Sequence, residues 1–115
     1  MPPLPADQMR TLAARSVAAR RARAAWLDSL TVDSFTGGAV WLDVELDPDL
    51  YGPIPLGVAM RAAGFARRLN NEPAARRLKL GHRLVTVANR PAWKTAVLDW
   101  INDPGVPVDE GFPWT

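Results

Sequence analysis

Residues 13–27 read Ala13-Ala14-Arg15-Ser16-Val17-Ala18-Ala19-Arg20-Arg21-Ala22-Arg23-Ala24-Ala25-Trp26-Leu27. Alanine and arginine are strong helix formers, and Val17 is the one β-branched residue among them, so the stretch predicts a helix. At about 100° per residue, its arginines and Arg10 surround the helix and leave no wide apolar stripe. A helix that packed along its whole length would keep one side free of charge. We therefore expect the first turns to project and the end from about Ala24 to dock.

The helix is expected to begin at Ala6-Asp7, after the Pro-rich arm Met1–Pro5, and to run to about Leu30. The side chain of Asp7 is suited to cap the free N–H groups at the start of this helix. The large apolar residues gather near its end, which agrees with a helix anchored there. The chain has 115 residues, which predicts one helical domain, 1–103, and an extended acidic Pro-rich tail, 104–115.

The chain has no cysteine, which excludes disulfides, thiolate catalysis and cysteine-based zinc sites. It shows neither the apolar core of a signal peptide nor the run of about 20 apolar residues that spans a membrane. We therefore expect a cytoplasmic protein.

The charges are segregated into four blocks although the net charge is only +2. Residues 1–27 carry five arginines and one acid, and residues 61–94 carry nine bases and one acid. Residues 28–60 carry six acids and no base, and residues 95–115 carry four acids and no base. If the two basic blocks meet, they form a basic face with an acidic back, as in nucleic-acid binders. The alternative is that the blocks pair within the fold, although surface pairs contribute only ~0–1 kcal/mol each.

Residues 39–46 are ambiguous. Their apolar residues alternate with Trp41, Asp43 and Glu45, which favours a strand slightly, but Val40 and Val44 also suit a short helix. Residues 56–69 predict a helix, which Gly57 and Gly64 weaken by up to about 1 kcal/mol each and in which glycine permits close approach of another backbone.

The remainder of the chain predicts three further elements. Pro73 precedes a short helix over 74–80 with Gly81 as its C-cap. Residues 83–88 are β-branched and predict a short strand or an extended connector. The last helix spans about 90–102 with Asn89 as its N-cap, and its apolar stripe is the clearest helical period in the chain. The stripe consists of Trp93, Ala96, Val97, Trp100 and Ile101.

No catalytic or metal-binding motif is present, so we expect no enzyme, metal or cofactor. His82 is the one histidine, its neighbours in sequence are cationic, and we interpret it as a loop residue or a phosphate contact. The carboxylates of Asp43, Glu45, Asp47 and Asp49 would share one face of a strand, which suits a divalent cation or paired carboxylate chemistry. Pro48 interrupts this run, so a solvated acidic edge is the better interpretation.

The tryptophans Trp26, Trp93 and Trp100 are expected to build the core. Phe112 and Trp114 lie in the acidic tail and have no such explanation. We interpret them as contacts for a protein partner.

Several stretches resemble the actinobacterial integration host factor proteins. The segment Ala18-Ala19-Arg20-Arg21-Ala22-Arg23-Ala24 is similar to their first helix, and Arg76-Arg77-Leu78-Lys79-Leu80-Gly81 is similar to a later basic segment. The stretch from Trp41 to Ile54 resembles theirs in length and ends in a similar Gly turn before a helix. The chain departs from the family at Gly64-Phe65-Ala66-Arg67-Arg68, which lacks the glycine pair of their phosphate-holding hairpin. The resemblance implies an all-helical, nucleoid-associated protein that binds duplex DNA, and it favours a helix over 39–46.

We therefore expect a mainly α fold: a small single-domain helical protein with a long projecting N-terminal helix and a Pro-rich C-terminal tail. The first hypothesis is an architectural or regulatory protein that contacts the phosphates of double-stranded DNA with low sequence specificity. The predicted contacts are Arg15, Arg20, Arg21 and Arg23 on the first helix, and Arg67, Arg68, Arg76, Arg77, Lys79 and Arg83 on a second surface. The alternative is a protein-interaction module, an adaptor or phage-type host-binding protein, that uses its tryptophans and Phe112 and Trp114 of the tail.

Overall fold

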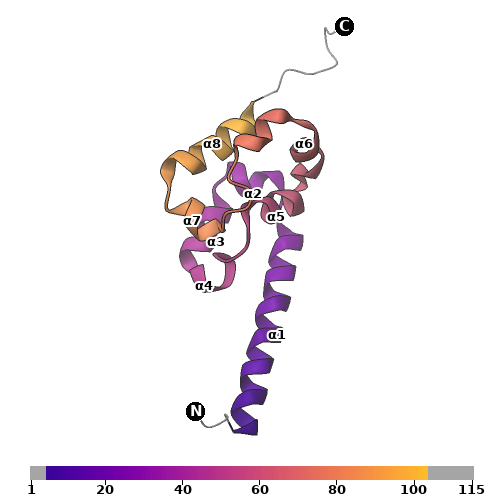
Figure 1. Ribbon diagram of the computed structural model, residues 1–115, viewed down its shortest axis with the longest axis vertical. Helices are drawn as coiled ribbons and strands as arrows, with labels where there is room; N and C mark the ends of the chain where they lie inside the picture. Colours follow the sequence, from indigo (N-terminus) through magenta and orange to yellow (C-terminus); the bar gives the residue numbers. More distant parts are fainter. Residues whose placement is uncertain (1–4, 104–115) are drawn as a thin grey trace, which may run out of the picture.

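The computed structural model describes residues 5–103, which form a small helical domain from which one long helix projects (Figure 1). Within this range the only β-structure is an isolated bridge between Pro55 and Arg83. The expected mainly α fold is confirmed, whereas the tail 104–115 lies outside the described residues. The elements are α1 (Ala6–Ser29), α2 (Val32–Thr36), α3 (Ala39–Leu46), α4 (Pro48–Tyr51), α5 (Leu56–Met60), the π-helical turn η1 (Arg61–Phe65), α6 (Ala66–Asn71), the 3-10 helix η2 (Pro73–Arg77), α7 (Leu84–Ala88) and α8 (Pro91–Asn102).

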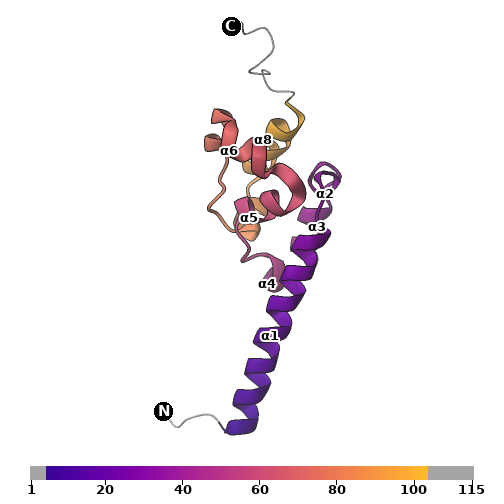
Figure 2. The same cartoon turned by 90° about the vertical axis from the view of Figure 1, so that its right-hand side faces the viewer.

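The helix α1 has 24 residues, and its rise of 1.5 Å per residue makes it about 36 Å long. Every residue from position 5 to position 18 is exposed, and Trp26 is its buried residue. The predicted projection of the first turns is therefore confirmed (Figures 1 and 2). The predicted cap is wrong, because Pro5 occupies the N-cap and Asp7 lies in the first turn without a capping hydrogen bond.

The C-terminal third of α1 is anchored through Trp26. Its ring stacks on Tyr51 with 4.5 Å between centroids, and its Nε1 donates a hydrogen bond to Asp43 Oδ2 at 2.8 Å. Leu30, just past the helix, is buried in the same core. The aromatic residue at the end of the Ala/Arg stretch therefore fixes the angle at which α1 leaves the domain.

Residues 39–46 form the helix α3, so the slight preference for a strand is wrong and the helix favoured by the resemblance is correct. Gly38, in the left-handed region with a φ of 83°, turns the chain into the helix. Val40 and Val44, one turn apart, are both buried. A strand would have put Val40, Leu42, Val44 and Leu46 on one face, but Leu42 and Leu46 are 54% and 74% exposed.

The helix expected over 56–69 is divided at Gly64. Gly64 has a φ of 112°, which only glycine adopts without strain, and it separates α5 and most of η1 from α6. Met60 and Phe65 remain buried on either side of the break. Two helices joined by a tight turn therefore replace one longer helix.

The two expectations for residues 74–88 were inaccurate. The short helix over 74–80 is instead η2, which ends at Arg77, and Gly81 does not cap it. Residues 84–88 form the helix α7 rather than a strand or an extended connector, with Leu84 and Val87 buried three residues apart. Burial of these two side chains against the core outweighs the modest β preference of the segment.

The apolar stripe of the last helix is confirmed in α8. Val97, Trp100 and Ile101 are buried and Trp93 packs partly buried against the core, while Ala96 is exposed. The Phe65 ring meets the Trp100 ring edge to face at 5.8 Å. The predicted cap is wrong by one residue, because Arg90 rather than Asn89 occupies the N-cap.

Candidate nucleic-acid interface

The arginines of the projecting arm are open to solvent. Arg15, Arg20 and Arg21 are exposed on α1. Five residues separate Arg15 from Arg20, which corresponds to a rise of about 7.5 Å along the helix. These guanidinium groups make no hydrogen bond or ion pair with any of residues 5–103.

Arg23 differs from its neighbours because it joins α1 to α4. Its Nε donates a hydrogen bond to the Leu50 carbonyl oxygen at 2.6 Å, and its Nη2 donates to the Asp49 carbonyl oxygen at 3.3 Å. The side chain is half-buried. Arg23, predicted as a phosphate contact, therefore has donors already used inside the fold.

Arg68 is likewise an internal arginine. It forms an ion pair with Glu72, and it donates hydrogen bonds to the carbonyl oxygens of Trp100 and Ile101 at 2.9 and 3.1 Å. The hydrogen bonds that Arg68 donates to the Glu72 carboxylate raise the pKa of Arg68 above its ordinary value, so the guanidinium stays charged. Its role is to close the C-terminal end of α8, where the last carbonyl groups attract a cation.

The charge blocks do not neutralise each other across the described part of the chain. Within residues 5–103, the ion pair between Arg68 and Glu72 is the one that brings nitrogen and oxygen within 4.0 Å. Both members of this pair belong to the block 61–94, so within the described residues the basic blocks do not form ion pairs with the acidic blocks. Apart from Arg23, whose donors bind carbonyl oxygens, the arginines and lysines outside this pair have no carboxylate partner within the described residues.

Trp93 gathers basic side chains from separate segments. The Lys79 Nζ lies 5.3 Å and the Arg90 Cζ 4.7 Å from the centroid of its ring, and the His82 ring meets it edge to face at 4.8 Å. Lys79 and His82 belong to the connection between η2 and α7, and Arg90 is the N-cap of α8. Lys79 is a predicted DNA contact and His82 a predicted loop residue or phosphate contact. Arg90 was not predicted, and its one signal in the sequence is its place in the basic block 61–94.

The turn that carries Lys79 and His82 is fixed to the start of α5. The backbone N–H of Leu56 donates to the His82 carbonyl oxygen and that of Gly57 donates to the Leu80 carbonyl oxygen, both at 2.8 Å. A Cβ at Gly57 would lie 3.2 Å from Leu80 and 2.8 Å from the Arg61 guanidinium. Gly57 therefore permits the close backbone approach that the sequence suggested.

The other predicted residues of the second surface are exposed. Arg67 lies on α6, Arg76 and Arg77 on η2, and Arg83 directly before α7. Arg61, which was not predicted, is exposed beside the same turn. In Figure 2 the connection between α6 and α7 runs along one side of the domain, while α2 and α3 of the acid-only block lie on the opposite side. The projecting end of α1 leans toward the side of that connection.

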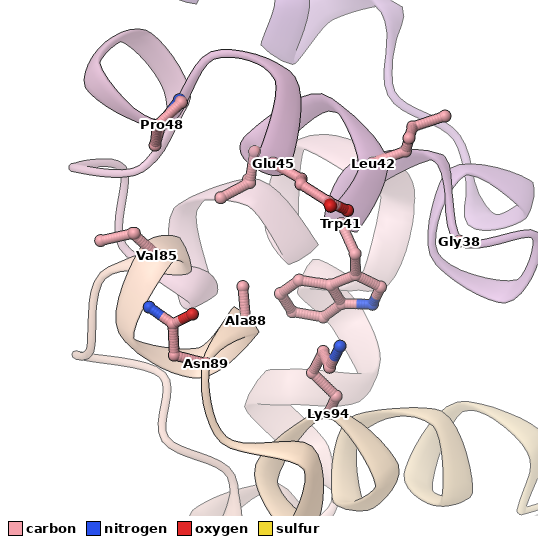
Figure 3. Close-up of a pocket in the computed structure, with 10 residues that line it drawn as sticks. Gly38, Trp41, Leu42, Glu45, Pro48, Val85, Ala88, Asn89 and Lys94 are labelled. Carbon is pink, nitrogen blue, oxygen red and sulfur yellow. The ribbon is translucent and has the colours of Figure 1, made fainter.

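A pocket of about 630 Å³ opens between α3, α7 and α8 (Figure 3). The Trp41 ring points into it from α3, and Lys94 reaches toward that ring from α8. The exposed Leu42 also lines the pocket. The pocket contains no histidine and its single carboxylate is Glu45, so it offers an apolar surface rather than catalytic groups.

The acidic run does not gather into a cation site. Asp43 accepts the hydrogen bond of Trp26, and Asp47 Oδ1 accepts a bond from the Leu50 N–H at the start of α4. Residues 5–103 contain no group of three or more histidine or acidic side chains that suits a metal ion.

Phe112 and Trp114, the predicted partner contacts, lie outside the described residues. Among the described helices, none is both long and apolar enough to cross a membrane. Comparisons with protein-family models, curated proteins and solved structures gave no match to this chain.

Proposed function

We propose that the protein binds double-stranded DNA through its phosphate backbone, with low sequence specificity and in an architectural or regulatory role. The observation that carries this proposal is the set of exposed basic groups on α1 and around Trp93, which have no carboxylate partner within residues 5–103. Duplex DNA presents one negative charge per about 1.7 Å of its axis, so the arm from Arg15 to Arg21 spans several phosphates.

The low specificity follows from the kind of side chain that is exposed. Arginine forks and lysine ammonium groups position a protein on phosphates, whereas sequence is read by contacts to base edges. Arg23 and Arg68 are excluded from the proposed contacts because their donors bind carbonyl oxygens of the fold. The resemblance of the Ala/Arg helix to the actinobacterial integration host factor proteins supports the same reading.

A gel-shift titration of the full chain with duplex DNA at 50 and 200 mM salt tests the proposal. If about six phosphates are neutralised, the affinity falls about 10³-fold between the two concentrations. The R15Q/R20Q/R21Q variant should bind more weakly with a salt slope smaller by about 2.7, and R15K/R20K/R21K, which keeps the charge, should retain most of the slope. Binding that is absent or insensitive to salt would reject the proposal.

A protein-interaction module is the second candidate, favoured by the Trp41 pocket, which the exposed Leu42 lines, and by the exposed Leu46 one turn later on the same helix. Since residues 28–60 carry six acids and no base, the partner that suits this face is a basic segment with apolar residues. A Leu/Lys-rich helical peptide is a suitable probe, and L42Q/L46Q should weaken its binding without affecting duplex DNA. On the protein-interaction hypothesis, deletion of residues 104–115 abolishes partner binding. On the DNA-binding hypothesis, the same deletion leaves DNA binding unchanged or strengthens it.

A further inference from the structure

The Trp93 ring is surrounded by more basic groups than an aromatic side chain needs for packing. Lys79, Arg90 and His82 all lie within 4.7–5.3 Å of its centroid, and they come from the η2–α7 connection and the N-cap of α8. An aromatic ring attracts cations over its faces, so Trp93 holds the long side chains of Lys79 and Arg90 beside it, while the His82 ring meets it edge to face. The Trp93 ring therefore determines where the positive charges of Lys79 and Arg90 lie.

Two cationic groups share the Trp93 ring, and an anion placed beside the ring would attract both of them. Like charges repel, and no carboxylate of residues 5–103 lies within ion-pair distance of Lys79 or Arg90. The first turn of α8 also contains no acidic residue, so the partial positive charge at its N-terminus is not compensated there. A negatively charged group beside the ring would therefore be attracted by Lys79, by Arg90 and by the N-terminal end of α8.

The backbone around this cluster is fixed in place. The turn from Lys79 to His82 is closed by a hydrogen bond from the His82 N–H to the Lys79 carbonyl oxygen at 3.0 Å. Two further bonds, from Leu56 and Gly57, attach the turn to α5. A preorganised cluster of donors loses less conformational entropy on binding than free side chains do.

We propose that Trp93 positions Lys79, His82 and Arg90 as one phosphate-binding site, which takes a phosphate group of the DNA backbone. Arg90 offers a planar fork, Lys79 a point charge, and His82 an N–H donor in either protonation state. Trp93 is a positioning residue that acts through these three groups. This inference rests on the proposed DNA binding and specifies the Trp93 cluster as the point where the folded domain binds the DNA backbone.

The test is the salt dependence of duplex binding by W93L, compared with wild type, W93F and W41L. Loss of two organised cations should lower the salt slope by about 1.8 and the affinity at 100 mM salt more than about tenfold. W93F keeps an aromatic face and should retain most of the slope. W41L removes another partly buried tryptophan, which lines the pocket between α3, α7 and α8 and makes none of the contacts to Lys79, His82 or Arg90, and it should bind as wild type does. A salt slope of W93L equal to that of W41L, with wild type binding normally, would overturn the inference but not the proposed function.

Thermal melts of all four proteins separate positioning from folding. If W93L melts far below the others, K79Q/R90Q replaces it, because both side chains are exposed and the ring is kept. That variant should show the same reduced slope, and an unchanged slope would overturn the site. Absence of binding by wild type would instead reject the proposed function.

Inorganic phosphate carries the same kind of charged oxygens as the DNA backbone, so a second experiment distinguishes the two ligands at this site. The Trp93 indole N–H resonance, assigned as the one missing in W93F, is followed while inorganic phosphate or duplex DNA is added at constant ionic strength. A shift with DNA alone supports a site for the backbone phosphodiester, and a saturable shift with inorganic phosphate as well supports a site for any phosphate group. A resonance that moves with neither would overturn the proposal.

Discussion

The guanidinium of Arg68 lies 4.1 Å from the centre of the Trp100 ring and donates a hydrogen bond to the Trp100 carbonyl oxygen. One side chain thus covers the ring that meets Phe65 in the core and also binds a carbonyl group at the end of α8. Arg67, its neighbour in the sequence, is exposed on α6. Two adjacent arginines in one basic cluster therefore have opposite roles, one internal and one available to a ligand.

Replacement of Arg68 by alanine should destabilise the domain by about 2 kcal/mol, because hydrogen bonds to a charged group and packing on Trp100 are lost together and Glu72 is left unpaired. The salt slope of DNA binding should not change. R67A is the matched control and should reduce the slope by about 0.9 with little effect on stability. Urea unfolding and DNA titrations of the two variants make the comparison, and equal stability of R67A and R68A would contradict it.

Replacement of Arg23 by alanine should loosen the docking of α1 on α4. The variant loses bonds to the carbonyl oxygens of Leu50 and Asp49, and we expect a loss of about 1–2 kcal/mol of stability. R21A, two residues earlier and exposed, should leave the stability within about 0.5 kcal/mol of wild type. The measurement is the free energy of unfolding, and a larger effect of R21A than of R23A would show that the arm docks differently.

The sequence predicted the long helix, its projection and its anchor well, because those follow from local composition and from where the large apolar residues lie. Residues 39–46 were ambiguous because Val40 and Val44 satisfy both a period of two and one helical turn. Arg23 could not be separated from the exposed arginines, since it binds the Leu50 carbonyl group 27 residues away. For Arg68 the sequence offered only Glu72, four residues on, whereas the carbonyl groups that make it internal lie 32–33 residues away. The cluster at Trp93 depends in the same way on a backbone approach at Gly57 that leaves no mark in charge or hydropathy.

Replacement of Gly57 by alanine should displace the basic turn. The added methyl group would meet Leu80 at 3.2 Å and the Arg61 guanidinium at 2.8 Å, so Arg61 must swing away and Leu80, with the turn that carries it, must shift away from α5. We expect a loss of about 1–3 kcal/mol of stability and weaker binding of duplex DNA. G81A lies in the same connection, where an added methyl group would meet nothing within 4 Å, and it should behave as wild type. Similar melting temperatures for G57A and G81A would contradict the role of Gly57.

Removal of residues 1–15 tests the separation between the projecting arm and the folded domain. The described residues of that segment are all exposed, so the deletion should change the free energy of unfolding by less than about 0.5 kcal/mol. It removes Arg10 and Arg15, which should lower the salt slope of DNA binding by about 1.8. The R10Q/R15Q variant keeps the length of the arm and should give the same slope, since the charge rather than the helix makes the contact. A deletion that destabilises the domain strongly would show that the first turns of α1 serve the fold. A deletion that leaves the salt slope unchanged would show that they do not contact DNA.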